Sequence, residues 1–508
     1  MKRILATLLC VLLLMGCGTE GSEYVPTGDA LVIDGVTEPP TEDPDAVEQQ
    51  MELAYYPKYS LNPYFATNIA NRVLFSLVYQ GLFATDSNYE SVPILCSQMT
   101  VSEDMRTYTI YLDPKASFSD GSKVTLEDVL ASYEAARKSV YYSGRFVHVS
   151  GFALTEEGGI SFRLNTAMEK FPLLLDIPIV KAAEVDAERP IGSGPYYYEE
   201  GASGLRLRRR GDWWCTSDIV VTANAIPLQE VESPRLLRDA FEFSNVGLAC
   251  ADPCSDSYVE YRCDFELWDC DNGTFLYLGL NITKPVLQNV AFRSALTYAI
   301  DRQTLSDKYY HGFAQPASLP CSPSSPYYSK LLAERYDYDP DAFSSAVASS
   351  YPLGSEIVFL VNKDDTMRLR VARDIAETLK SHNINIKLEE LSTKAYNEWI
   401  KYGMYDIYLG QTKLSPNMDL SPFFRGYGSL SGGILMDEAL YSMCQQALAN
   451  SGNYFNLHEN VMEDGRIVPV LFYIYSIHAT RGLVTGLRPS RDNVFCYSIG
   501  KTLGDVVQ

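Results

Sequence analysis

Residues 118–137 read FSDGSKVTLEDVLASYEAAR and specify a tight turn followed by a capped helix. Asp120-Gly121 is a tight-turn dipeptide, because glycine adopts a positive φ without steric cost. Thr125 is placed to cap a helix, with Asp128 three residues later in a capping-box position. Just upstream, TYTIYL (107–112) alternates as a half-buried strand does. The sequence predicts strand, turn and capped helix in close succession, with Asp120 and Asp128 as turn and cap residues.

The whole chain has the composition of a soluble globular protein of two or three domains. It has 508 residues, of which 46% are hydrophobic and 21% charged. The formal net charge of −22 argues against a nucleic-acid partner, because a phosphate-binding surface needs a basic patch. The one basic run, RLRRRG (206–211), is more typical of a solvated strand edge.

The N-terminus has the layout of an export signal. Lys2 and Arg3 precede an apolar run over residues 4–15, which is too short to span a bilayer as a mature helix. The run ends in LMGC (14–17), which resembles the bacterial lipobox, in which the cysteine becomes the lipidated first residue. We therefore expect residues 1–16 to be a lipoprotein signal peptide and Cys17 to carry a lipid anchor.

Residues 17–50 are expected to form an acidic, disordered tether between that anchor and the folded body. From residue 18 to 50 the chain has no Lys or Arg, nine acidic residues and four prolines. Such a segment cannot bury enough apolar surface to fold, and its like charges keep it extended. No later apolar stretch is long enough to cross a bilayer, so we expect the protein to be attached to the membrane rather than embedded in it.

Four cysteines, Cys250, Cys254, Cys263 and Cys270, lie within one short window. Outside the cytoplasm they could form one or two disulfides, with three pairings if all four take part. A zinc site is the more specific alternative. The spacing of the cysteines lacks paired C-x-x-C motifs, however, and no histidine lies nearby in the sequence. The pattern favours structural cysteines, with no metal site and no cofactor.

Strands and helices alternate along the folded part, which predicts α/β layers with mixed sheets. Residues 356–362, 368–380 and 384–391 read as a β-α-β unit. Further helices are predicted over 69–82 and 292–302, and further strands over 51–56, 205–209, 405–412 and 468–476.

Catalytic motifs are not found. The five histidines form no H-E-x-x-H and no i, i+4 pair, and G-x-S-x-G and the phosphate-binding glycine motifs do not occur. A lone histidine is more often a satisfied core or surface residue than a base. We expect a protein that is not an enzyme.

Five segments, in order, resemble the peptide- and nickel-type solute-binding proteins of ABC importers, the bacterial extracellular solute-binding family 5. They are YSLNPYFATNIANRVLFSLVYQGLFATD (59–86), TYTIYLDPKASFSDGSKVTLEDVLASYE (107–134), GSGPY (192–196), NVAFRSALTYAIDRQTL (289–305) and YDYDP (336–340).

The resemblance implies two α/β lobes joined by a hinge, the periplasmic-binding-protein-like fold of type II, cluster C, with an extra inserted domain. On that picture the first lobe comprises residues 51–86, 183–275 and 465–508, the inserted domain residues 87–182, and the second lobe residues 276–464. A ligand would bind between lobes that close around it by hinge motion.

The resemblance also suggests ligand-binding residues. Asn62 and Tyr64 face the cleft in the family. Peptide-binding relatives place an acid shortly after a G-W pair, but here Gln411 stands where Trp is usual, and Lys413 and Leu414 stand where the acid would fall. The first acid is Asp419, so either Asp419 takes that role from a shifted loop or the ligand has no free amine.

The implied function is a lipid-anchored receptor on the extracytoplasmic face of the cell membrane. It would capture a small solute, in the first place a short peptide, and deliver it to an ABC permease with its cytoplasmic ATPases. A sensory lipoprotein of the same fold is the alternative among binding proteins, and a cell-surface peptidase is the alternative of a different class.

Overall fold

The structure is a computed structural model, and it describes residues 51–66, 69–202, 204–215, 223–251, 261–352, 354–426, 430, 435–483, 489–491 and 493–495. The predicted signal peptide, Cys17 and the tether lie outside these residues, as does Cys254. Among the described residues, no helix is both long and apolar enough to cross a membrane.

The segment that opened the sequence analysis folds as predicted. Strand β5 is Thr107–Leu112 and helix α3 is Leu126–Lys138. The capping box is present: the Thr125 side chain accepts from the Asp128 amide, and the Asp128 carboxylate accepts from the Thr125 amide at 2.8 Å. Asp120 accepts from the Ser122 amide at 2.9 Å, and Gly121 has a φ of 83°. Asp120 and Asp128 are therefore turn and cap residues, as expected.

The inserted segment, which we define as residues 87–182, contains an antiparallel sheet of order β4-β5-β7-β6. The other three strands are β4 (Cys96–Val101), β6 (Val149–Leu154) and β7 (Ile160–Leu164). Tyr133 of α3 packs against Phe146, Phe152 and Phe162, which joins the helix to this sheet. A separate pair, β2 (Phe83–Thr85) and β3 (Ser91–Pro93), precedes it.

The first lobe has a sheet of order β1-β10-β9-β8. Its strands are β1 (Leu53–Tyr55), β8 (Tyr196–Gly201), β9 (Gly204–Arg209) and β10 (Ala225–Glu230). β1 runs parallel to β10, and β8 and β9 form an antiparallel hairpin. One continuous apolar core joins this lobe to the inserted segment, with Leu53, Leu77, Phe118 and Phe162 among its buried members.

The largest sheet has the order β11-β17-β12-β16-β14-β15, with β13 paired to β17. Its strands are β11 (Leu248–Ala251), β12 (Glu266–Leu280), β13 (Ala314–Pro316), β14 (Glu356–Asn362), β15 (Asn385–Leu391), β16 (Ile407–Lys413) and β17 (Ile467–Ala479). β14 and β15 are parallel and joined by α9 (Thr366–Ser381), which confirms the predicted β-α-β unit.

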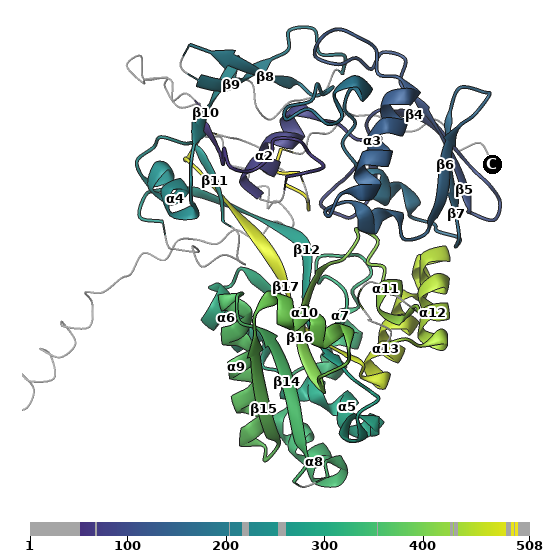
Figure 1. Cartoon of the computed structure of the whole chain (residues 1–508), viewed down its shortest axis with the longest axis vertical. Coiled ribbons are helices and arrows are strands. Elements are labelled where there is room, and N and C mark those ends of the chain that lie inside the picture. The colour runs from purple at the N-terminus through teal and green to yellow at the C-terminus, as the bar shows by residue number, and fades with distance from the viewer. Residues whose placement is uncertain are drawn as a thin grey trace, which may run out of the picture. The chain divides into compact units, whose positions relative to one another are not determined.

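Strands β12 and β17 link the first lobe to the second, which we take as residues 276–464 (Figure 1). They pair in antiparallel fashion along most of their length, with a register shift between Asp271 and Phe275. The predicted boundary at residue 275 falls inside β12, so the connection between the lobes is a continuous strand rather than a loop. All of the domain boundaries stay predictions.

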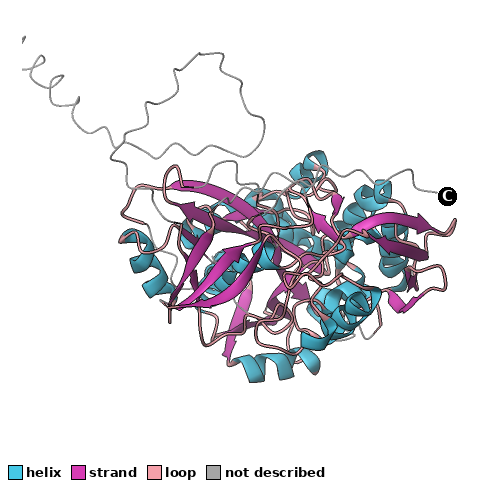
Figure 2. Ribbon diagram, turned by 90° about the horizontal axis from the view of Figure 1, so that it is seen from above, coloured by secondary structure: helices cyan, strands magenta, loops and turns pink. Residues whose placement is uncertain are grey.

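The other helices cover the sheets, and strands and helices are mixed throughout (Figure 2). They are α2 (Ile69–Val78), α4 (Pro234–Glu242), α5 (Val290–Ala295), α6 (Arg302–Tyr310), α7 (Lys330–Ala333), α8 (Pro340–Ser350), α10 (Thr393–Lys401), α11 (Ser421–Phe424), α12 (Glu438–Ala449) and α13 (Tyr454–Asp464). Short 3₁₀ turns lie at η1 (Ser143–Phe146), η2 (Phe171–Leu175), η3 (Ala182–Glu184), η4 (Pro285–Gln288), η5 (Leu296–Ala299), η6 (Glu334–Tyr336) and η7 (Ser451–Asn453).

The prediction of one helix over 292–302 was wrong, because the chain breaks between α5 and α6. Ile300 is extended, and Asp301 caps a new helix by accepting from the Thr304 amide at 3.1 Å. The Arg302 side chain is buried and donates to the carbonyls of Ala317 at 3.0 Å and Pro469 at 3.1 Å. The motif AIDR thus starts a helix and fixes it to the sheet.

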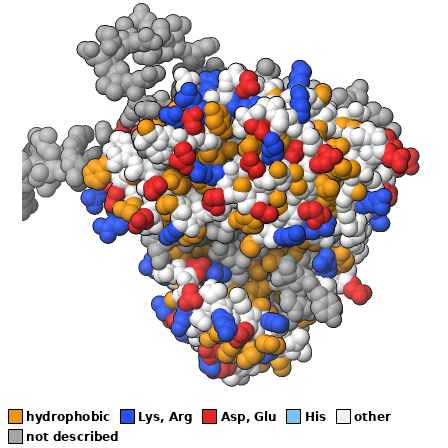
Figure 3. All heavy atoms as spheres, turned by 45° about the horizontal axis from the view of Figure 1, so that its top comes forward, with side chains coloured by type: hydrophobic (Ala, Val, Ile, Leu, Met, Phe, Trp, Pro, Cys, Tyr) orange, Lys and Arg blue, Asp and Glu red, His pale blue; other side chains and the backbone are white. Residues whose placement is uncertain are grey.

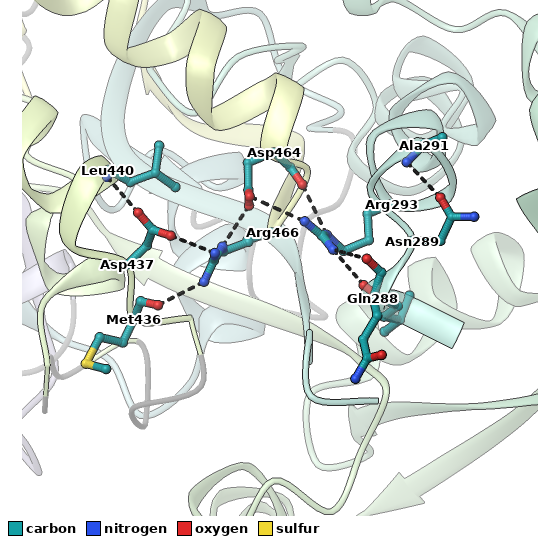
Figure 4. Close-up of polar contacts among 10 residues, drawn as sticks. Gln288, Asn289, Ala291, Arg293, Met436, Asp437, Leu440, Asp464 and Arg466 are labelled. Atoms are coloured by element: carbon teal, nitrogen blue, oxygen red, sulfur yellow. Dashed lines mark hydrogen bonds and ion pairs between the residues drawn. The ribbon is translucent and has the colours of Figure 1, made fainter. Parts of the chain in front are cut away.

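Arg293, the other arginine of segment 289–305, belongs to a network at the end of α13 (Figure 4). It donates to the Asp464 main-chain carbonyl at 3.1 Å, and its guanidinium lies 3.3 Å from the Asp464 carboxylate. Arg466 bridges Asp464 at 2.8 Å and Asp437 at 2.7 Å. Asp437 is also the N-cap of α12. The network ties the end of α13 to the starts of α12 and β17, so the motif positions structure rather than ligand.

Candidate functional site

The end of β16 and the loop after it lie against the inserted segment, and this contact between the lobes is the candidate binding region. Lys413, the last residue of β16, donates to the hydroxyl of Tyr141 at 2.7 Å. On the first-lobe side, the Arg72 guanidinium lies 3.2 Å from the centroid of the same ring. Arg72 also donates to the Tyr142 hydroxyl at 2.7 Å. Two cations from opposite lobes therefore share one aromatic side chain.

A second contact between the lobes lies at the register shift of β12. The Asp271 carboxylate accepts from the hydroxyls of Tyr89 and Ser322, and from the Gly273 amide at 2.6 Å. Ser322 belongs to the second lobe, whereas Tyr89 lies at the start of the inserted segment. Asp271 therefore joins both sides at the strand that connects the lobes.

Arg491, from the C-terminal part of the first lobe, adds a further cation beside this contact. It is buried and donates to the Leu414 carbonyl at 2.5 Å, directly after Lys413. Arg72, Lys413 and Arg491 thus come from three separate segments. Elsewhere on the surface shown in Figure 3, Lys and Arg side chains are interspersed with Asp and Glu.

Asn62 and Tyr64, predicted to bind ligand, hold the loop before α2 in place. Asn62 is fully buried, and its amide donates to the carbonyls of Val185 at 2.9 Å and Ala187 at 2.8 Å. The Tyr64 hydroxyl donates to the Pro178 carbonyl at 2.7 Å. These bonds give both residues a structural role, and their contact with a ligand stays a prediction.

Gln411 lies on β16 opposite Leu276 and is half-buried. Its side-chain oxygen accepts from the Tyr473 hydroxyl at 3.3 Å. Gln411 and Lys413 are two residues apart on one strand, so their side chains lie on the same face of the sheet. The strand therefore presents an amide and a cation on the same face, with Lys413 at the contact between the lobes.

Asp419 is buried and engaged by the inserted segment. Its Oδ2 lies 2.9 Å from Nε2 of His148, and the same nitrogen lies 2.8 Å from Oγ of Ser421. The Ser421 amide and hydroxyl both donate to the carboxylate, at 2.8 and 2.9 Å. Burial opposes ionisation of Asp419, but the hydrogen bond and charge of His148, with the bonds from Ser421, hold its pKa below the usual value.

Ser421, His148 and Asp419 do not form a nucleophile relay. In such a relay the imidazole bonds the serine through one ring nitrogen and the acid through the other. Here the serine and the acid both bond Nε2, and the Ser421 side chain is fully buried. The cluster is therefore a hydrogen-bonded contact between segments and gives no support to a peptidase.

His148 and Ser421 were not predicted as site residues. The histidine is separated from Asp419 by 271 positions, and a lone histidine carries no spacing signal. The sequence does indicate position 413, because a cation there departs from the family pattern. No motif identifies its partner, Tyr141.

The cysteine window gives no metal site among the residues that the structure describes. Cys250 and Cys263 carry free thiols, Cys254 lies outside the described residues, and the side chain of Cys270 is not described. No group of three or more metal-ligating side chains gathers within the described part of the chain. The pairing of these cysteines stays a prediction.

Comparisons with known proteins match this architecture. The family model described as bacterial extracellular solute-binding proteins, family 5, middle region, matches residues 90–433. The glutathione-binding protein GsiB of Salmonella typhi is 24% identical over 318 residues, which are 58% of this chain and 62% of that protein. GsiB of Escherichia coli O157:H7 is 23% identical over 293 residues, 55% and 57% of the two chains. The chain thus spans less than two thirds of these curated relatives.

Solved structures share the fold at low identity. The ABC transporter substrate-binding protein CtaP of Listeria monocytogenes has a TM-score of 0.71 at 18% identity, covering 88% of this chain and 97% of that one. DppA of Helicobacter pylori, solved with the peptide STSA, has a TM-score of 0.63 at 18% identity, covering 89% and 97%. These likenesses establish the two-lobed fold.

Proposed function

Because the chain belongs to the bacterial extracellular solute-binding proteins of family 5, we propose that it captures short peptides between its lobes and delivers them to the permease of an ABC importer. The match of the family model over residues 90–433 carries this proposal. The curated relatives are named for glutathione binding, and one structural neighbour was solved with a peptide, which supports a peptide-like solute.

Gln411 and Lys413 are the residues that we propose to meet the solute. Lys413 replaces the acid that would hold a free amine, and a cation disfavours a neighbouring ammonium group. The Asp419 carboxylate is engaged by His148 and Ser421. A solute that relies on its main chain and carboxylate, rather than on an N-terminal amine, fits this arrangement best.

Lys413→Met is expected to weaken peptide binding by about tenfold, because it removes a cation and the bond to Tyr141 that joins the lobes. Isothermal titration calorimetry with defined peptides of two to five residues measures the effect. Lys394→Met, at an exposed position of α10, is the matched control and should bind as the wild type does. Equal affinities for wild type and Lys413→Met would remove Lys413 from the site, and binding of no peptide by the wild type would refute the proposed solute.

Membrane attachment through Cys17 is the second part of the proposal. The apolar run ending in LMGC supports it, and the acidic tether would hold the folded body away from an anionic leaflet. Cys17→Ser is expected to release the protein from the membrane fraction, as followed by sedimentation and immunoblotting. A variant that still sediments with membranes would contradict lipidation of Cys17.

A further inference from the structure

His148, Asp419 and Ser421 form a polar contact that joins the inserted segment to the second lobe. The exposed fractions of the three residues are 4%, 7% and 0%, so water does not compete for their bonds. His148 lies just before β6, whereas Asp419 lies in the loop before α11 and Ser421 is the first residue of that helix. His148 belongs to the inserted segment, and Asp419 and Ser421 belong to the second lobe. The bonds to His148 therefore cross from one part of the protein to the other.

The Asp419 side of the contact is already rigid within the second lobe. Both carboxylate oxygens accept from Ser421, one from its amide and one from its hydroxyl. Its other neighbours are the Cys444 thiol, whose pKa is raised by burial and by the Asp419 charge, and the Tyr454 hydroxyl, whose pKa is raised by burial first and also by that charge. Neither can neutralise the carboxylate, and His148 is the hydrogen-bonding partner that faces it from the inserted segment.

The contacts around this cluster are bonds to backbone or neutral groups. Arg425 donates to the Val147 carbonyl at 3.4 Å, and Gln445 donates to the Thr166 hydroxyl at 3.0 Å. The Glu169 amide donates to the Leu448 carbonyl at 2.8 Å. Together they extend the interface along α12, which lies beneath the sheet of the inserted segment in Figure 1.

We propose that His148, Asp419 and Ser421 are a clasp that holds the inserted segment closed against the second lobe. The protein itself supplies both halves of this closing contact, so the clasp favours the closed arrangement independently of the solute's chemistry. Removing one partner leaves the other buried and under-bonded when the lobes are closed, whereas in an open arrangement water hydrates it. Each single substitution therefore shifts the equilibrium toward opening.

Closure can be measured as energy transfer between fluorophores attached to unnatural amino acids at two exposed positions. Glu157 of the inserted segment and Ser381 at the end of α9 are suitable, and the measurement uses the full folded protein without added solute. His148→Phe and Asp419→Asn are each expected to lower the closed-to-open ratio by about tenfold. The double variant should lower it no further than the single variants, because the two residues act through one bond.

Asp437→Asn is the matched control. Asp437 is also a hydrogen-bonded carboxylate of the second lobe, but its partner Arg466 lies in the same network of Figure 4. It should lower the melting temperature and leave the closed-to-open ratio unchanged. An unchanged ratio in His148→Phe would overturn the proposal. Should that variant not fold, Ser421→Ala tests the half of the clasp that the second lobe contributes. A lower closed-to-open ratio in Ser421→Ala supports the clasp, and an unchanged ratio overturns it.

Discussion

Gly194→Ala is expected to lower the free energy of unfolding by about 3 kcal/mol or more, because its new methyl group would meet backbone rather than side chain. A Cβ at this position would lie 2.4 Å from the Leu77 carbonyl oxygen and 2.6 Å from the Val78 carbonyl carbon. The Gly194 amide also donates to the Val78 oxygen at 2.9 Å. The motif GSGPY thus ends α2 by close approach of two backbones.

Gly144→Ala provides the control, since a Cβ there meets nothing within 4 Å. That variant should stay within about 0.5 kcal/mol of the wild type. Urea unfolding followed by circular dichroism compares the two. A Gly194→Ala protein as stable as Gly144→Ala would contradict the close approach of the GSGPY turn to α2.

His458→Phe is expected to remove part of the acid sensitivity of the protein. His458 is fully buried on α13, neither ring nitrogen has a hydrogen-bond partner, and burial lowers its pKa to about 3. Between pH 6.5 and about 3 the unfolded chain binds a proton that the folded chain excludes. The neutral ring therefore makes its full contribution to the free energy of unfolding above pH 6.5. That contribution is lost as the pH falls from 6.5 to about 3, by about 5 kcal/mol in total.

The measurement compares urea unfolding of wild type and His458→Phe at pH 7, 6, 5 and 4. For each pH unit below 6.5, the free energy of unfolding of the variant should rise relative to that of the wild type by about 1.4 kcal/mol. His478 is another buried imidazole, and burial lowers its pKa to about 4. It is present in both proteins, so it leaves the difference between them unaffected. Parallel pH profiles for the two proteins would show that His458 is not held neutral by burial.

Local signals in the sequence were sufficient for much of the fold. The Thr125 and Asp128 capping box and the strand at 107–112 are made by residues close together in the chain, so their pattern predicts them directly. The same holds for the β-α-β unit at β14, α9 and β15. The prediction of one helix over 292–302 was wrong because Asp301 caps a new helix, α6, instead of continuing the preceding one. The Arg302 side chain also donates hydrogen bonds to carbonyls that are distant in the sequence, which the local pattern does not predict.

The candidate site was less predictable, since its contacts depend on segments far apart in the sequence. Position 413 could be flagged by comparison with a family pattern, yet its partner Tyr141 comes from the inserted segment. The sequence suggests Asp419 as a ligand residue only because it is the first acid after β16. Its engagement by His148 depends on how the lobes meet, which no spacing rule encodes.

Native mass spectrometry tests the central claim most directly. The protein, purified without denaturant and incubated with a mixture of peptides of two to five residues, should show the mass of one bound peptide. The bound species should diminish in Lys413→Met and persist in Lys394→Met. A spectrum that contains only the mass of the free protein would contradict the proposal that this chain captures short peptides.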